Sequence, residues 1–270
     1  MTLEARPEEF HQTMTTTERR VLVHPDKQAL AASVAARFLT KTSDIIADYG
    51  DAHVVLTGGT IGIASLAAVN ASPARDTVDW SKVHFWWGDE RFVPKGDPER
   101  NELQAREALL DHIAVPAGNI HAFAASDEVD TLEEGVARYT EELARFSPDG
   151  GQWPRFDITF LGVGPDGHIA SLFPEMAGIR VTDAPVIAVR NSPKPPPERL
   201  SLTRPVINSS ERVWLVLSGT DKASALGLAL AGASYTEVPA AGAKGRRRTV
   251  YFVDQDAAAE VPENLIADTY

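Results

Sequence analysis

The chain has 270 residues, of which 43% are hydrophobic and 24% charged, and it carries a formal net charge of −12 and no cysteine. These proportions are ordinary for a globular protein, and the length suits one large α/β domain or two small ones. The lack of cysteine excludes disulfides, thiolate metal sites and a cysteine nucleophile, and it fits a reducing compartment. The acidic balance argues against nucleic acid or an anionic membrane as the main partner.

The amino-terminal segment is polar and rich in threonine, so we expect a flexible tail over residues 1–18 and a folded domain over 19–270. The tail holds no apolar run of signal-peptide length, and no later stretch of the chain is long enough to span a bilayer. A cytoplasmic protein without a membrane partner is therefore expected.

Short apolar runs alternate with helical patterns along the rest of the chain. The expected strands cover 21–23, 53–56, 83–87, 156–163, 185–189, 212–217 and 249–253. The expected helices cover 26–48, 61–69, 101–112 and 131–146, then a segment from 218–222 through 230, with a short helix after the last strand. This alternation predicts an α/β fold with a mainly parallel central sheet and helices on both faces. Ligands of such sheets bind at the carboxyl ends of the strands.

Four polar segments that contain glycine follow directly on predicted strands, so they can converge on one crevice. In Gly58-Gly59-Thr60, glycines between a strand and a helix let backbone amides and the Thr60 hydroxyl approach an oxyanion such as phosphate. A tight turn explains the same glycines equally well. Lys222 lies in the first turn of another helix, where a cation opposes the helix dipole unless an anion is near. An exposed lysine without a role is the alternative there.

A charged segment follows the aromatic strand that ends at Trp87. A solvated loop with an internal ion pair would explain it. Its position at the end of a strand favours a functional interpretation, in which Arg91 binds an anion and Asp89 orients a partner or takes a proton.

Residues 162–167 match the pattern G-x-G-x-x-G, but they do not fit dinucleotide binding. That fingerprint should open a full helix, with an acidic residue about twenty positions on. Here Pro165 lies within the loop, and Pro174 closes the expected helix after barely two turns. His168 follows the glycines at once, and an imidazole, whose ordinary pKa is roughly 6.5, suits proton transfer near neutrality. We therefore interpret His168 as a candidate base.

The segment 192–199 contains four prolines, which fix its path and can hold Lys194 and Arg199 at little cost in entropy. A plain surface connection is the alternative. The sequence has no H-E-x-x-H motif, no other histidine spacing typical of a metal site and no G-x-S-x-G nucleophile elbow. We expect neither a metal nor a cofactor.

Together these segments resemble the 6-phosphogluconolactonase family, which is related to glucosamine-6-phosphate deaminase. The resemblance rests on 56–60, 87–94, 161–174, 192–203 and 218–222, and it covers nearly the whole chain after about residue 20. It implies hydrolysis of 6-phospho-D-glucono-1,5-lactone to 6-phosphogluconate, the second step of the oxidative pentose phosphate pathway. It also implies a single-domain, Rossmann-like three-layer fold shared with the deaminase.

The resemblance implies a role for each candidate residue by its position. His168 matches the proposed base, and Asp89 with Arg91 matches an active-site pair. The positions that match phosphate-binding residues are Gly58, Gly59, Thr60 and Lys222, and Lys194 and Arg199 lie in a segment near the site. On this basis His168 activates water, Arg91 or backbone amides stabilise the oxyanion, and Asp89 holds the imidazole or the substrate hydroxyls.

Three alternatives remain. Glucosamine-6-phosphate deaminase typically carries Asp-Glu-Tyr where this chain has residues 89–91, and Phe-Asn-Glu-Pro at 171–174, and both differences favour the lactonase. A non-catalytic sugar-phosphate sensor would often carry a DNA-binding segment, and none is visible. A nicotinamide-dependent dehydrogenase rests only on the glycine pattern. The expected partner is a small sugar-phosphate lactone, without nucleic acid, bound by a monomer or weak homo-oligomer.

Overall fold

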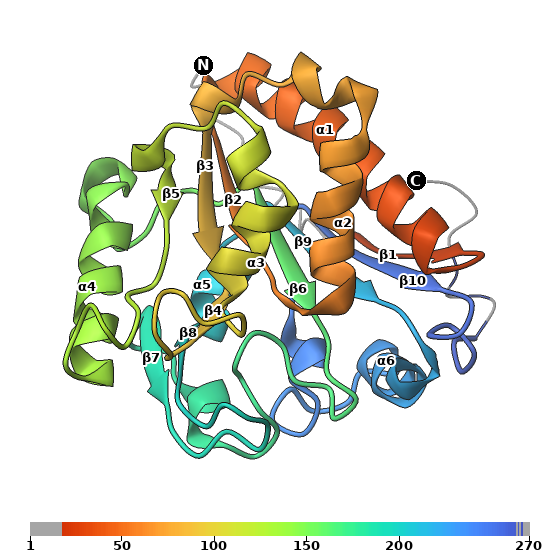
Figure 1. The fold of residues 1–270 in the computed structure, drawn as a ribbon. Helices are drawn as coiled ribbons and strands as arrows, with labels where there is room; N and C mark the ends of the chain where they lie inside the picture. The colour runs from red at the N-terminus through yellow and green to blue at the C-terminus, as the bar shows by residue number, and fades with distance from the viewer. Residues whose placement is uncertain (1–17, 263, 265, 267–270) are drawn as a thin grey trace, which may run out of the picture.

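The computed structural model describes residues 18–262, 264 and 266. At its centre is a seven-stranded sheet in the order β1-β10-β9-β6-β2-β3-β5, and all neighbouring strands in it are parallel (Figure 1). Its strands are β1 (Glu18–His24), β2 (Ala52–Leu56), β3 (Val83–Trp87), β5 (Ile120–His121), β6 (Ile158–Gly162), β9 (Arg212–Leu217) and β10 (Arg248–Asp254). The predicted parallel sheet is confirmed. Of the tail expected over 1–18, residues 1–17 lie outside the described part of the chain, and residue 18 begins β1.

Three short strands form a second, antiparallel sheet in the order β4-β8-β7. They are β4 (Asp89–Arg91), β8 (Arg199–Leu202) and β7 (Val186–Val189). The strand expected over 185–189 therefore exists but lies outside the parallel sheet. β4 was not predicted as a strand, because its three charged residues hide the strand pattern, and β8 begins at Arg199, the last residue of the segment expected as an extended loop. Backbone pairing places Arg91 opposite Arg199 and Asp89 opposite Ser201 in this small sheet.

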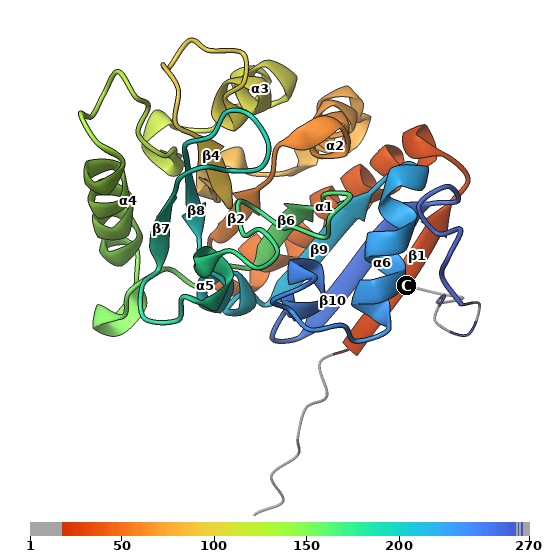
Figure 2. The same ribbon diagram turned by 90° about the horizontal axis from the view of Figure 1, so that it is seen from below.

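Helices cover both faces of the parallel sheet, as predicted (Figure 2). α1 (Lys27–Tyr49) and α2 (Gly59–Ala71) pack together on one face, and α6 (Ala223–Leu230) lies on the other. α1 begins where the Asp26 carboxylate accepts a hydrogen bond from the backbone N–H of Ala29, and it ends at Gly50, whose φ is 94°. The other α-helices are α3 (Asn101–Ala108), α4 (Leu132–Arg145) and α5 (Arg204–Asn208).

Short 3₁₀ helices fill several connections. They are η1 (Pro73–Thr77), η2 (Trp80–Lys82), η3 (Leu110–His112), η4 (Ala117–Asn119), η5 (Pro148–Gly150), η6 (Ala177–Arg180), η7 (Thr220–Lys222) and η8 (Pro239–Gly242). The helix expected over 101–112 thus ends at Ala108 and is followed by η3. Directly after the last strand, residues 255–260 form turns and not the short helix that was expected there.

The short helix expected to close at Pro174 was also wrong. Ala170 has a φ of 47°, a left-handed conformation that a right-handed helix does not contain. Ile169 instead pairs with Val163 and with Leu172 through isolated β-bridges. The segment after the glycine loop is therefore a compact, bridged turn.

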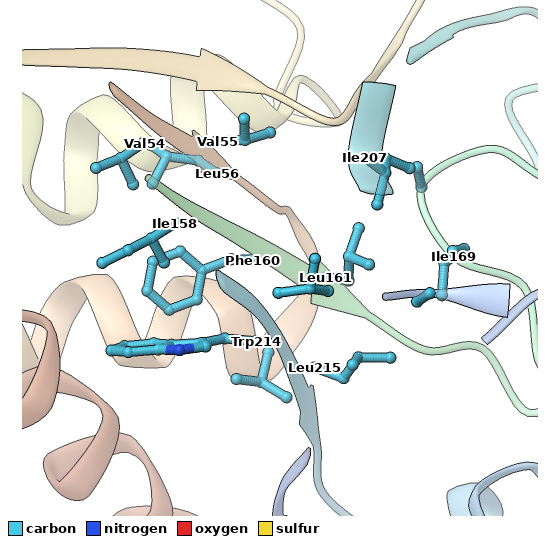
Figure 3. Packing of buried hydrophobic residues seen from close by; sticks show 14 of the residues in the cluster. Val54, Val55, Leu56, Ile158, Phe160, Leu161, Ile169, Ile207, Trp214 and Leu215 are labelled. Atoms are coloured by element: carbon cyan, nitrogen blue, oxygen red, sulfur yellow. The ribbon is translucent and has the colours of Figure 1, made fainter. Parts of the chain in front are cut away.

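The core lies on both sides of the central strands (Figure 3). Between the sheet and α1, the ring of Phe160 lies 5.6 Å from that of Phe38 and 5.3 Å from that of Trp214, in edge-to-face contacts. Ile169 is fully buried in the same core cluster as Leu161. Burial of Ile169 anchors the chain immediately after His168, so the candidate base is attached to the rigid part of the molecule. Among the described residues no helix is both long and apolar enough to cross a membrane.

Three histidines form a stacked row on neighbouring strands of the sheet. The ring of His84 lies 4.6 Å from that of His53 and 5.3 Å from that of His121. Burial lowers the pKa of His53 to about 3 and that of His121 to about 4, with the neighbouring imidazoles and arginines acting in the same direction. For His121 the adjacent Glu142 carboxylate opposes the shift. These rings are therefore neutral at pH 7.

Acidification is expected to destabilise the fold through this row. The unfolded chain takes up a proton on His53 near pH 6.5, whereas the folded chain does so only near pH 3. Between pH 7 and pH 5, His53 alone should remove about 2 kcal/mol from the free energy of unfolding. Urea denaturation of the native protein and of His53→Asn at both pH values checks this. Burial raises the pKa of Glu90 to about 7 and that of Asp157 to about 6. These carboxyl groups therefore increase the free energy of unfolding as the pH falls, and they do so in both proteins. An equal loss of stability in the two would contradict the prediction.

Candidate active site

A cavity of about 450 Å³ lies at the carboxyl ends of the central strands, which face the lower edge in Figure 1. Its wall brings together all the residues that the sequence singled out, although they come from segments far apart in the chain. These residues are Gly58, Gly59, Thr60, Asp89, Arg91, His168, Lys194, Arg199 and Lys222. Parallel strands produce this convergence because their carboxyl ends meet at one edge. The size suits a small, polar ligand.

The start of α2 forms one wall of the cavity. Gly58 is its N-cap residue, and no side chain among the described residues caps the helix there. The first backbone N–H groups of α2 therefore have no acceptor within the helix, and they lie at the positive end of its dipole. Thr57, one residue earlier, accepts a hydrogen bond at Oγ1 from the backbone N–H of Gly162, 3.1 Å away. This bond ties the glycine loop after β2 to the end of β6.

Lys222 lies at the start of α6, with its ammonium 2.9 Å from Asp221. The preceding turn is fixed by Asp254 at the end of β10. That carboxylate accepts a hydrogen bond of 2.5 Å from the Ser218 hydroxyl and one of 3.1 Å from the backbone N–H of Gly219. Burial opposes the ionisation of Asp254, but these bonds outweigh it and lower its pKa. Lys222 is thus presented to the cavity from a rigid turn.

The imidazole of His168 is held by Asp166, a residue that the sequence analysis did not identify. The distance from Nδ1 of His168 to Oδ1 of Asp166 is 2.5 Å. Burial opposes the ionisation of Asp166, but the bond to His168, the charge of His168 and the charge of Lys194 outweigh it, and the pKa falls to about 2. An ionised carboxylate only accepts hydrogen bonds, so Nδ1 must donate. In the neutral ring Nε2 is then the free acceptor.

The turn around His168 allows this contact because Gly164 has no side chain. A Cβ at Gly164 would overlap the imidazole at Nδ1. The backbone N–H of Gly164 donates to the carbonyl of His168 at 2.9 Å, and the ring of Phe173 lies 4.6 Å from the imidazole. The glycine that resembled part of a nucleotide fingerprint therefore makes room for the histidine. The signal in the sequence for Asp166 was its position two residues before His168 within a tight turn.

Asp89 is 6% exposed. One of the two roles expected for it was to hold the imidazole of His168, and it does not do so. Its Oδ2 accepts a hydrogen bond of 2.6 Å from the Ser171 hydroxyl and lies 4.0 Å from Nη1 of Arg199. The structure gives the contact with His168 to Asp166 instead. Asp89 thereby joins the turn after His168 to the strand β8.

Arg199 is buried and is largely committed to its own loop. Its guanidinium donates to the backbone carbonyls of Lys194, Pro195 and Pro196 at 3.0, 3.1 and 3.2 Å. These bonds fold the proline-rich segment back over the cavity, so the segment is more than a surface connection. Burial lowers the pKa of Lys194, and the charges of Lys222 and Arg199 act in the same direction, while Asp166 opposes them. Because the charges of Lys222 and Arg199 both affect the pKa of Lys194, the three cations lie close together at one site.

Arg91 and Lys27 complete the charged wall. Nη1 of Arg91 donates to the backbone carbonyl of Glu99 at 2.6 Å, which holds the side chain along the cavity. Lys27 is exposed, lines the same cavity and is the first residue of α1. Sequence reasoning missed Lys27, although the argument that marked Lys222, a cation opposed to a helix dipole, applies to it equally. In the described part of the chain, no three His, Cys, Asp or Glu side chains are grouped so that they could hold a metal ion.

Comparison with known proteins places this chain in a family. Residues 25–252 match the family model described as glucosamine-6-phosphate isomerases/6-phosphogluconolactonase. The chain belongs to this family. The 6-phosphogluconolactonase of Streptomyces coelicolor is 50% identical over 250 residues, which are 91% of this chain and 96% of that protein. The 6-phosphogluconolactonase of Mycobacterium tuberculosis is 44% identical over 242 residues, which are 89% of this chain and 97% of that protein.

Solved structures agree with the fold. The 6-phosphogluconolactonase of Thermotoga maritima has a TM-score of 0.76 at 27% identity, covering 88% of this chain and all of that one. A monomeric glucosamine-6-phosphate deaminase has a TM-score of 0.73 at 20% identity, covering 89% of this chain and 99% of that one. The second likeness concerns the fold alone. The predicted relationship to the deaminase fold is confirmed.

Proposed function

We infer that this protein is a 6-phosphogluconolactonase, which hydrolyses 6-phospho-D-glucono-1,5-lactone to 6-phospho-D-gluconate in the oxidative pentose phosphate pathway. The observation that carries the inference is the pairing of Nδ1 of His168 with the ionised Asp166 at 2.5 Å, in a cavity that also gathers Lys194 and Lys222. A base and an anion-binding wall in one cavity suit a substrate with a phosphate at one end and a lactone at the other.

The phosphate group binds at the start of α2 and at Lys222 in this proposal. The uncapped N–H groups after Gly58 supply donors and the positive end of a helix dipole, and the Thr60 hydroxyl adds another donor. Lys194 and Lys27, which line the same cavity, strengthen the attraction for a dianion. Fixing the phosphate places the lactone ring against His168 and reduces the entropy that the reaction must lose.

His168 acts as the base in this proposal. Its Nε2 takes a proton from a water molecule while the water oxygen bonds to the lactone carbonyl carbon, C1. Arg91 or backbone N–H groups stabilise the negative charge that develops on the carbonyl oxygen. The bond between C1 and the ring oxygen then breaks, and the imidazolium returns its proton to that oxygen. Asp166 keeps the ring in the required tautomer and stabilises the imidazolium, while Asp89 and Arg199 hold the surrounding loops or contact substrate hydroxyls.

The setting of the protein forms part of the same proposal. We place it in the cytoplasm as a monomer or weak homo-oligomer that binds neither nucleic acid nor membrane. The formal net charge of −12 and the lack of cysteine support this setting.

A proton-release assay tests the function directly. Freshly prepared phosphogluconolactone also hydrolyses spontaneously, so the rate of acid production is compared with and without the protein and with heat-inactivated protein. We expect a large acceleration by the native protein alone. No acceleration would remove the proposal. Release of ammonia from glucosamine 6-phosphate, measured in parallel, would favour the deaminase instead.

A further inference from the structure

Asn101 carries a buried amide in the wall of the cavity, and the proposed mechanism gives it no role. It is the first residue of α3 and is 2% exposed. Its backbone is fixed by Glu90, whose carboxylate accepts hydrogen bonds from the backbone N–H groups of Arg91, Asn101 and Glu102 at 2.9, 2.7 and 2.9 Å. Glu90 therefore replaces the missing side-chain cap of α3 and holds Asn101 against β4.

The side chain of Asn101 joins two segments of the site. Its Nδ2 donates to the backbone carbonyl of Asp89 at 3.0 Å. Its Oδ1 is buried and has no hydrogen-bond partner within the described part of the chain. Buried acceptors are nearly always paired, so an unpaired one that is held so firmly calls for an explanation.

Oδ1 of Asn101 lies directly against Gly58, the N-cap residue of α2. A Cβ added to Gly58 would overlap both Oδ1 and Cγ of Asn101. The φ of Gly58 is −80° and its ψ is −159°, a conformation that any residue adopts, so backbone freedom does not require a glycine here. Close approach of the Asn101 amide requires it. The amide therefore sets the distance between the glycine loop and the strand that carries Asp89 and Arg91.

We propose that Asn101 is a positioning residue that holds the phosphate-binding loop at Gly58 in register with the strand β4, and so aligns a bound sugar phosphate with His168. The inference rests on the proposed function only for the identity of the ligand. The side chain of Asn101, the spacer, contacts Gly58 and Asp89, and both of these residues line the cavity. An error of about 1 Å in such alignment can cost about 100-fold in rate.

Four variants test the proposal: Asn101→Ala, Gly58→Ala, the double variant and, as a matched control, Asn208→Ala. Asn208 donates a similar amide bond, of 2.9 Å, to the carbonyl of Gly242 but does not line the cavity. Binding of 6-phosphogluconate and of inorganic phosphate is measured by titration calorimetry, and kcat and KM are measured with the lactone. Urea midpoints report stability separately.

We expect Asn101→Ala to weaken binding of both probes and to lower kcat/KM by about 10- to 100-fold. Gly58→Ala should lose more, because its Cβ displaces the Asn101 amide. The double variant should recover to the level of Asn101→Ala, because the overlapping atoms are gone. Asn208→Ala should bind as the native protein does, whatever its urea midpoint.

Two outcomes would overturn the proposal: unchanged binding in Asn101→Ala, or a double variant no better than Gly58→Ala. Failure of the lactonase function is recognised separately. In that case the native protein does not accelerate lactone hydrolysis, and the dependence of phosphate binding on the Asn101–Gly58 contact still decides whether the spacer exists.

Discussion

Replacing His168 with alanine is expected to lower kcat for lactone hydrolysis by about 10²- to 10⁴-fold, the range that a positioned general base contributes. KM should change little, because the start of α2 and Lys222 lie on other elements and are untouched. An interaction made only in the transition state lowers kcat and kcat/KM together. Initial rates of proton release over a range of lactone concentrations, corrected for spontaneous hydrolysis, provide the measurement.

The control for this variant is His112→Ala. His112 lies in η3, outside the cavity. Its ring nitrogen Nε2 forms a hydrogen bond of 2.9 Å with the backbone carbonyl of Glu107. We expect its kinetics to equal those of the native protein. Added imidazole should partly restore His168→Ala, because the vacated space borders the cavity. Near-native turnover in His168→Ala would show that some other group activates the water.

The parallel sheet could be predicted because its strands are buried on both faces. Such strands form apolar runs, as in 213–217 and 250–253. The strands predicted over 212–217 and 249–253 agree with the observed bounds within a residue. The antiparallel sheet was missed because β4 has three residues, all of them charged, and β8 begins at an arginine. Their burial depends on partners that are distant in the chain, so no local pattern indicates it.

The gathering of most candidate residues could be predicted because they follow strands of the parallel sheet, whereas Lys194 and Arg199 follow β7 of the small antiparallel sheet. The contacts among them could not, since they depend on the paths of the loops. Ala170 in a left-handed conformation turns the chain back so that Ile169 is buried and no helix forms. Asn101 lies ten residues beyond Arg91, yet it contacts Gly58 from another strand's loop. Spacing along the sequence carries no signal for such a contact.

Replacing Asp166 with asparagine is expected to lower kcat by about 100-fold, a large part of what a general base contributes. The carboxylate accepts from Nδ1 of His168 and so leaves Nε2 free to take a proton. An asparagine amide can donate to Nδ1, which favours the tautomer with the proton on Nε2, the wrong one for a base. Asp166→Asn should therefore be at least as impaired as Asp166→Ala, which imposes no tautomer. Lactone kinetics on both variants measure this.

A matched charge variant separates this role of Asp166 from a general effect of charge. In the native protein the pKa of Asp166, about 2, keeps the carboxylate ionised throughout the working range, and its contribution is lost only as pH falls through that value. Asp221→Asn makes the same charge change at the cavity wall, beside Lys222, and should alter KM while leaving kcat close to the native value. Turnover that is preserved in Asp166→Asn would mean that the contact of 2.5 Å is structural and that His168 is oriented by its fixed backbone alone.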